Sequence, residues 1–120
     1  MKTTKSQRQK LLSLKKREEF LLVQNKGKKW VSETVIIQTM PNDIGPSRIG
    51  FTVSKKISKS AVTRNRIKRR LRAAAADIIG VKGKSGHDYI LVGRAKSETV
   101  SYEQILKDLK WCLKRLELLA

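Results

Sequence analysis

A dense run of cations, AVTRNRIKRRLRAAAA at residues 61–76, carries the clearest chemical potential in this sequence. Six of the nine residues from Arg64 to Arg72 are Lys or Arg, and no Asp or Glu occurs between Asp43 and Asp77. Most are arginines, whose planar guanidinium can donate two hydrogen bonds to a phosphate group at once. Solvated helix faces usually mix both signs of charge. The run therefore predicts a surface that binds a polyanion.

The composition of the whole chain supports the same interpretation. Its 120 residues carry 28 Lys and Arg against 10 Asp and Glu, a formal net charge of +18. Such an excess favours a nucleic acid as partner. An anionic membrane surface is the alternative, but no apolar run approaches the roughly 18 residues that span a bilayer. We therefore expect no membrane partner.

Other chemistry has little support in the sequence. One cysteine, Cys112, and one histidine, His87, are too few for a structural zinc site, and no disulfide can form within the chain. No paired carboxylates, serine elbow or glycine-rich phosphate loop is visible. We expect no catalytic residue and no metal ligand in this chain, and a cytoplasmic location. The acid-free first 17 residues also resemble an organelle transit peptide, which is the alternative.

Helical periodicity predicts what holds the cations in place. At 100° per residue, an apolar stripe runs along a helix that begins at Ala61 and ends at Gly80. The stripe comprises Thr63, Ile67, Leu71, Ala74 and Ile78. Projected on the same helix, Asn65, Lys68, Arg69 and Arg72 lie roughly opposite the stripe, and Arg64, Arg66 and Arg70 lie nearer its flanks. The core is thus expected to fix the directions of these side chains.

The remaining elements predict one α+β domain. Residues 1–12 read as a flexible basic arm, and residues 13–120 as a single domain. A first helix from Ser13 to Gly27 precedes β-rich segments at residues 28–40 and 48–56, and another strand covers residues 88–94. Ser101 and Gln104 form a capping box before a long final helix. The order is α-β-β-β-α-β-α when the first segment is counted as two strands, a two-layer sandwich.

The few aromatic residues have two possible roles. Phe51 lies on the apolar side of its strand with Ile49 and Val53, and Trp111 lies beside the apolar stripe of the last helix. We expect both to pack in the core. Phe20 is the best candidate for stacking on an unpaired base, with core packing as the equal alternative. Cys112 is expected to be a small core residue.

One block of sequence resembles a known family. RIGFTVSKKISKSAVTRNRIKRRLRAA, residues 48–74, is similar to the signature of the protein subunit of bacterial ribonuclease P, where a strand ending in Ser-Lys-Lys leads to an Arg-Asn-Arg helix. REEF, DYILVGR and SYEQILKDLKWCLKRL agree in the same order. The similarity covers roughly residues 14–116.

The resemblance implies a fold and an activity. The fold is a mixed sheet with a left-handed βαβ crossover, like the second domain of ribosomal protein S5. The activity is removal of the 5′ leader from precursor tRNA by a ribonucleoprotein endoribonuclease. Its RNA subunit does the chemistry with Mg²⁺, and the protein binds this RNA and the single-stranded leader. The resemblance implies no obligate protein partner.

The family's functional residues carry over by position. The implied RNA-binding residues are Lys55, Lys56, Arg64, Asn65, Arg66, Lys68, Arg69, Arg70 and Arg72. The implied leader cleft lies between the basic helix, the first helix and the sheet, and its candidates are Phe20, Phe51 and Ser54.

Two departures and two rival functions accompany the resemblance. Many members have Gly-Asn where this chain has Ser58-Lys59-Ser60, so the turn before the basic helix is expected to differ. Many also have a second aromatic residue where this chain has Gln24, which predicts weaker or differently placed stacking on the leader. A ribosomal or assembly protein and a DNA-binding architectural protein would share the charge and the fold class.

Overall fold

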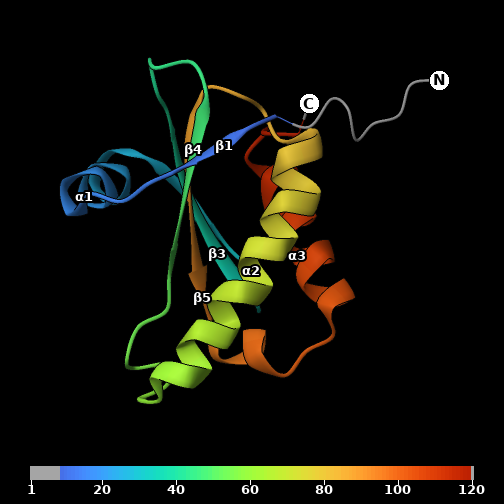
Figure 1. Ribbon diagram of the computed structural model, residues 1–120. Helices are drawn as coiled ribbons and strands as arrows, with labels where there is room; N and C mark the ends of the chain where they lie inside the picture. Colours follow the sequence, from blue (N-terminus) through green and yellow to red (C-terminus); the bar gives the residue numbers. More distant parts are fainter. Residues whose placement is uncertain (1–8, 120) are drawn as a thin grey trace.

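The computed structural model describes residues 9–119, which form one five-stranded mixed sheet with helices on both faces (Figure 1). The strands are β1 (Leu11–Ser13), β2 (Lys28–Val31), β3 (Val35–Pro41), β4 (Ser47–Thr52) and β5 (His87–Gly93). The helices are α1 (Arg17–Lys26), α2 (Ala61–Lys82), the short 3-10 helix η2 (Ala95–Glu98) and α3 (Tyr102–Arg115). The predicted α+β class is confirmed.

The sheet has the strand order β1-β4-β5-β3-β2. Strands β4 and β5 are parallel, with Arg48 opposite Asp88, and β3 pairs with β5 in the antiparallel sense. The chain leaves β4, crosses one face of the sheet through α2 and enters β5 beside β4, and this crossover is left-handed (Figure 1). The expected crossover is therefore present.

The main core lies between the sheet and the helices α2 and α3. Buried side chains from the sheet and from both helices meet there, including Ile37, Leu71, Leu91 and Leu109. A second, smaller core lies on the opposite face, where α1 covers part of the sheet (Figure 1). It contains Leu14, Val23 and Ile90, with Phe20 packed against it. The sandwich of sheet and α2/α3 thus has α1 added on its other side.

The N-terminal segment differs from the sequence prediction. Residues 1–8, most of the predicted arm, lie outside the described residues. Leu11–Ser13 form the edge strand β1, parallel to the start of β4, so the boundary predicted at residue 12 falls within a strand. The side chain of Gln9 donates to the carbonyls of Ile79 (2.9 Å) and Gly83 (2.7 Å) near the end of α2. These long-range contacts explain why a pattern limited to neighbouring residues missed the strand.

Other boundaries shift by a few residues. Helix α1 begins at Arg17 rather than Ser13, because Ser13 pairs in β1 and Leu14 is buried. The segment 28–40 is two strands, since Ser32 turns the chain by bonding to Val35 through its backbone and its hydroxyl. Helix α2 continues two residues beyond Gly80, and β4 ends at Thr52, four residues earlier than predicted.

Candidate nucleic-acid interface

Helix α2 is anchored by the stripe that its periodicity predicted. Ile67, Leu71, Ala74 and Ile78 are buried, while Thr63 is half-buried. Ser60 caps the helix by accepting a hydrogen bond from the backbone N–H of Thr63 at 3.2 Å. Asp77 is the one acidic residue in the sequence of α2, so the charges on this helix are almost all positive.

The residues that depart from the family pattern lie directly before this helix. The hydroxyl of Ser58 accepts from the backbone N–H of Ser60 at 3.1 Å, and the carbonyl of Ser58 accepts from Arg64 Nη1 at 2.9 Å. A side-chain oxygen at the position before a helix satisfies an N–H that would otherwise lack a partner. The turn that lacks the family's glycine thus supplies its own helix cap.

The three flank arginines of α2 are already engaged by the protein. Arg70 donates to the carbonyls of Ser97 (2.6 Å), Glu98 (2.9 Å) and Val100 (2.5 Å), all in or after η2. Arg66 lies 3.5 Å from the carboxylate of Glu98, and Arg64 holds Ser58 as described above. These side chains fix the two loops that adjoin α2.

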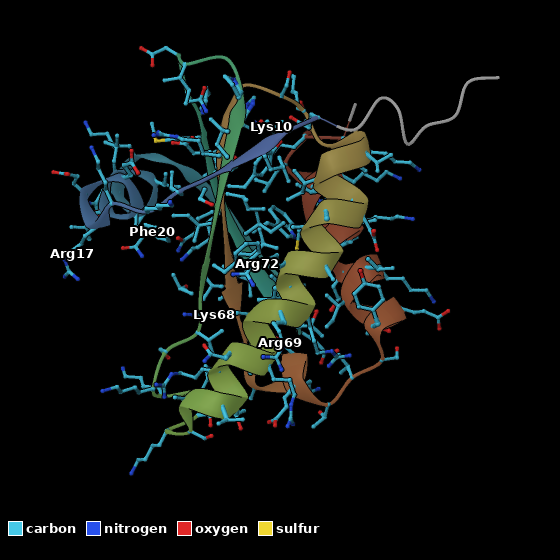
Figure 2. The ribbon with its side chains drawn as sticks, viewed as in Figure 1. Lys10, Arg17, Phe20, Lys68, Arg69 and Arg72 are labelled. Carbon is cyan, nitrogen blue, oxygen red and sulfur yellow. The ribbon has the colours of Figure 1, made fainter. Side chains whose placement is uncertain are left out.

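The opposite side of α2 carries the cations without such partners. The side chains of Lys68 and Arg69, and of the neutral Asn65 beside them, make no hydrogen bond or ion pair to any residue in the range 9–119. Figure 2 shows Lys68, Arg69 and Arg72 on the side of α2 that faces away from α3. Arg72 places its guanidinium 5.2 Å from the ring centroid of Phe51, a cation–π contact that also leaves donors available. This side can therefore contact phosphates directly.

Lys55 and Lys56 extend this charge beyond the helix. Both are exposed in a turn closed by the hydrogen bond from Ile57 N–H to the carbonyl of Ser54 at 3.0 Å. Ser54 is exposed as well, two residues after the end of β4. The predicted residues from 54 to 72 thus form one basic surface, apart from the three engaged arginines.

Phe20 lies on the other face of the sheet, against Gly50. A Cβ built on Gly50 would lie 2.4 Å from the Phe20 ring, so only glycine permits this close approach. Beside Phe20, a shallow hollow of about 400 Å³ is lined by Arg17, Phe20, Leu21, Gln24 and Thr52. One aromatic ring with a cation at its side can hold an unpaired base and a phosphate.

The structure does not bring Phe51 into this hollow. Alternate side chains of a strand point to opposite faces, so Phe51 lies on the α2 face with Ile49 and Val53, and Thr52 lies on the α1 face. The core packing expected for Phe51 is confirmed in part, since it packs half-buried against the main core. The predicted cleft residues therefore lie on both sides of β4. Because β1 pairs only as far as Ile49, no strand of residues 9–119 pairs with the rest of that edge of β4.

An ion-pair cluster that the sequence reading missed fixes α1 beside the sheet. Arg48 donates two hydrogen bonds to Asp88, from Nε (2.8 Å) and Nη2 (2.6 Å), and a third to Glu19 of α1 at 2.6 Å. Asn42 also donates to Asp88 at 2.9 Å. The hydrogen bond to Asp88 is the main cause that raises the pKa of Arg48. Strand alternation placed Arg48 on this face, but its partners are distant in the sequence.

The other singled-out residues have structural roles or lie at the surface. Cys112 is fully buried, as expected, and burial raises the pKa of its thiol. The expected burial of Trp111 is wrong, because 48% of it is exposed at the flank of α3. His87 is half-buried, and its Nδ1 contacts the Ser85 carbonyl at 2.9 Å.

The described residues offer no ready metal site or membrane span. Within residues 9–119, no three His, Cys, Asp or Glu side chains are grouped so that they could hold a metal ion. No helix in that range is long and apolar enough to cross a bilayer.

This fold and this surface define a small α+β protein of the nucleic-acid-binding class. A family model described as ribonuclease P matches residues 9–117. The ribonuclease P protein component of Paramagnetospirillum magneticum is 41% identical over 108 residues, which cover 86% of this chain and 80% of that protein. That of a Cyanothece species is 35% identical, covering 88% and 92% respectively.

Solved structures agree with the sequence comparison. The ribonuclease P protein of Staphylococcus aureus has a TM-score of 0.76 and 27% identity, covering 92% of this chain and 100% of that one. The protein from Thermotoga maritima has a TM-score of 0.74 and 29% identity, covering 86% and 96%. The chain belongs to the ribonuclease P protein family. It is a subunit of an endoribonuclease that processes tRNA, and it associates with the RNA subunit of that enzyme.

Proposed function

We propose that this chain binds the catalytic RNA of ribonuclease P through the exposed side of α2 and the 5′ leader of precursor tRNA beside Phe20. The observation that carries the first part is the division of the cations on α2. The side opposite the apolar stripe presents Lys68, Arg69 and Arg72, and none of them forms an ion pair with a carboxylate of the part of the chain that the structure describes. The phosphates of an RNA supply the missing negative charge.

The leader part of the proposal rests on the Phe20 hollow. Leaders differ in sequence, so they are best held by stacking and by contacts to the backbone rather than to base edges. Phe20 offers an aromatic ring, and Arg17 offers a cation in the same hollow. The Arg48 cluster keeps α1, and with it Phe20, at a fixed distance from the sheet.

We further propose that the RNA subunit holds the Mg²⁺ ions and performs the cleavage, in the cytoplasm. The scarcity of acidic groups near the basic surface supports this division of labour. Positive charge on the protein screens the repulsion between the two RNAs, which would lower the Mg²⁺ concentration that the complex requires. The residues that precede β1 would add further cations to this domain.

A binding experiment on the reconstituted holoenzyme tests the leader site. Affinity is measured for precursor tRNA with a leader of several nucleotides and for the same tRNA without a leader. Phe20→Ala should reduce the preference for the leader-bearing tRNA about tenfold, the loss of one stacked base. Phe51→Ala, on the opposite face of β4, is the matched control and should change both affinities equally.

An unchanged preference in Phe20→Ala, or an equal loss in Phe51→Ala, would contradict the leader site. The circular dichroism spectrum and unfolding midpoint of each variant establish that the fold is retained. The RNA subunit alone is measured in the same way. If the wild-type protein does not increase the preference for the leader-bearing tRNA above that of the RNA subunit alone, leader binding by this chain is contradicted altogether.

A further inference from the structure

A second surface of the molecule, at the far edge of the sheet, combines exposed aromatic and basic side chains. Trp111 of α3 is 48% exposed and Val31 of the edge strand β2 is 44% exposed, and both line one open hollow. Exposed large apolar side chains that adjoin one another mark binding surfaces more often than isolated ones do. We call this region, with Trp30 and the cations around it, the tryptophan surface.

The tryptophan rings hold each other in place. Trp30 and Trp111 meet edge to face, with ring centroids 5.8 Å apart and an angle of 72° between the planes. The guanidinium of Arg115 lies 5.2 Å from the Trp30 ring centroid. Such contacts restrict the rotamers of both rings before any ligand arrives, which reduces the entropy lost on binding. Trp111 is thus a preformed platform with part of its surface free.

The charge around the platform is predominantly positive. A second hollow beside Trp30 is lined by Lys28, Lys29 and Arg115, with Glu117 as its acidic residue. Helix α3 exposes Lys107, Lys110 and Lys114 along the same stretch as Trp111.

The acidic residues of the first hollow already have partners. Asp108 accepts from Thr34 (2.7 Å) and Gln104 (2.9 Å), and Glu33 pairs with Lys96 at 3.0 Å. An apolar protein partner would have to desolvate the surrounding lysines, whereas an RNA strand would neutralise them.

From this arrangement we propose that the tryptophan surface is a second RNA-binding site, which stacks an unpaired base on Trp111 and contacts the adjoining phosphates through Lys110 and Lys114. Aromatic platforms set among lysines bind single-stranded RNA with little sequence preference. Strand β2 is at one edge of the sheet, and β1 and β4 are at the other. The site is therefore separate from the Phe20 hollow, and it does not depend on the leader proposal.

Tryptophan fluorescence offers a direct test, because Trp30 and Trp111 are the two tryptophans of the sequence. A single-stranded oligouridylate of about a dozen nucleotides is titrated into the whole protein at low salt. We expect saturable quenching by the single strand and much weaker quenching by a duplex of the same length. The absence of quenching at concentrations where anisotropy shows the RNA bound would overturn the proposal.

Two matched charge variants separate local binding from general attraction. Lys110→Ala with Lys114→Ala removes two cations beside Trp111, and Lys68→Ala with Arg69→Ala removes two from α2. All four side chains lack hydrogen-bond or ion-pair partners within the described residues, so folding should be retained. The first pair should raise the RNA concentration for half-quenching at least about threefold, and the second by a smaller factor. Equal shifts, or the reverse order, would overturn the proposal.

A stacking variant and a measurement of self-association complete the test. In the Lys68→Ala, Arg69→Ala background, Trp111→Leu keeps an apolar side chain against Trp30 but removes the platform. It should weaken binding of a labelled oligouridylate about tenfold, and equal affinity would overturn the stacking role.

If sedimentation shows a wild-type dimer that Trp111→Leu dissociates, the surface binds a second copy of this chain and the RNA proposal is wrong.

Discussion

Arg69 and Arg70 are neighbours on α2 with opposite roles. The guanidinium of Arg70 donates to three backbone carbonyls of residues 97–100, whereas the side chain of Arg69 makes no hydrogen bond to any residue between 9 and 119. The same contrast holds for the whole helix. The arginines that flank the apolar stripe are bonded within the protein, and the cations opposite the stripe are available to RNA. A cation is a binding residue only where the protein has not already used its donors.

Arg48 is the extreme case of a cation that the protein keeps for itself, and its loss should have the largest effect. Arg48→Met leaves Asp88, which is 3% exposed, without its cation. Removing one partner of a buried ion pair costs about 3–5 kcal/mol of the free energy of unfolding. Urea denaturation measures this loss. The double variant Arg48→Met, Asp88→Asn should be more stable than Arg48→Met alone. If the double variant instead loses the sum of what the two single variants lose, the energetic coupling between Arg48 and Asp88 is contradicted.

The next prediction compares the two neighbouring arginines directly. Arg70→Ala should lower the free energy of unfolding by about 2–3 kcal/mol, because three charge-assisted hydrogen bonds to the segment after β5 are lost. Arg69→Ala should change it by about 0.5 kcal/mol or less. Thermal and urea unfolding of both variants provide the comparison. Equal stability of the two would remove the distinction between the sides of α2.

The reverse pattern is expected for RNA binding. Lys68→Ala with Arg69→Ala should reduce the slope of log K against log salt for the catalytic RNA by about two units, one for each lost phosphate contact. Arg64→Ala with Arg66→Ala should reduce it by less, since these side chains have partners within the protein. Filter binding at several salt concentrations gives both slopes. A larger drop for the second pair would show that RNA displaces the internal contacts.

The smallest expected effect concerns the bond between α2 and α3. The hydroxyl of Tyr102 donates to Asp77 at 2.6 Å, and burial followed by this bond raises the pKa of Tyr102 to about 12. Unfolded tyrosine has a pKa of about 10. Between these values the unfolded chain has lost a proton that the folded chain retains, so stability should fall as pH rises.

Unfolding midpoints between pH 8 and pH 11 check this sign. Tyr102→Phe should show a shallower fall, while the buried Tyr89, whose pKa is also raised by burial, keeps part of it. A wild-type midpoint that rises over this range would contradict the assignment.

The sequence predicted the features of this fold that depend on local periodicity. The apolar stripe of α2, the strand alternation that separates Phe51 from Thr52 and the cap at Ser101 are all present. Helical projection even placed the three engaged arginines nearer the stripe. It could not show that Arg66 and Arg70 are engaged, because their partners in residues 97–100 come close only through the β5–α3 connection.

The features that were missed depend on distant contacts. Strand β1 is three residues long and exists through its pairing with β4. The Arg48–Asp88 pair joins residues 40 positions apart. Trp111 lies beside the apolar stripe of α3, so its burial depended on whether another element covered that flank. Strand β2 ends the sheet there, and Trp30 covers only part of the ring.

Cleavage of precursor tRNA in a reconstituted mixture tests the central claim most directly. End-labelled precursor is incubated with the catalytic RNA alone, the protein alone, and both, over a range of Mg²⁺ concentrations. The account predicts mature 5′ ends only where the RNA is present, with the protein lowering the Mg²⁺ needed for half-maximal cleavage. Cleavage by the protein alone, or the same Mg²⁺ dependence with and without it, would contradict the account.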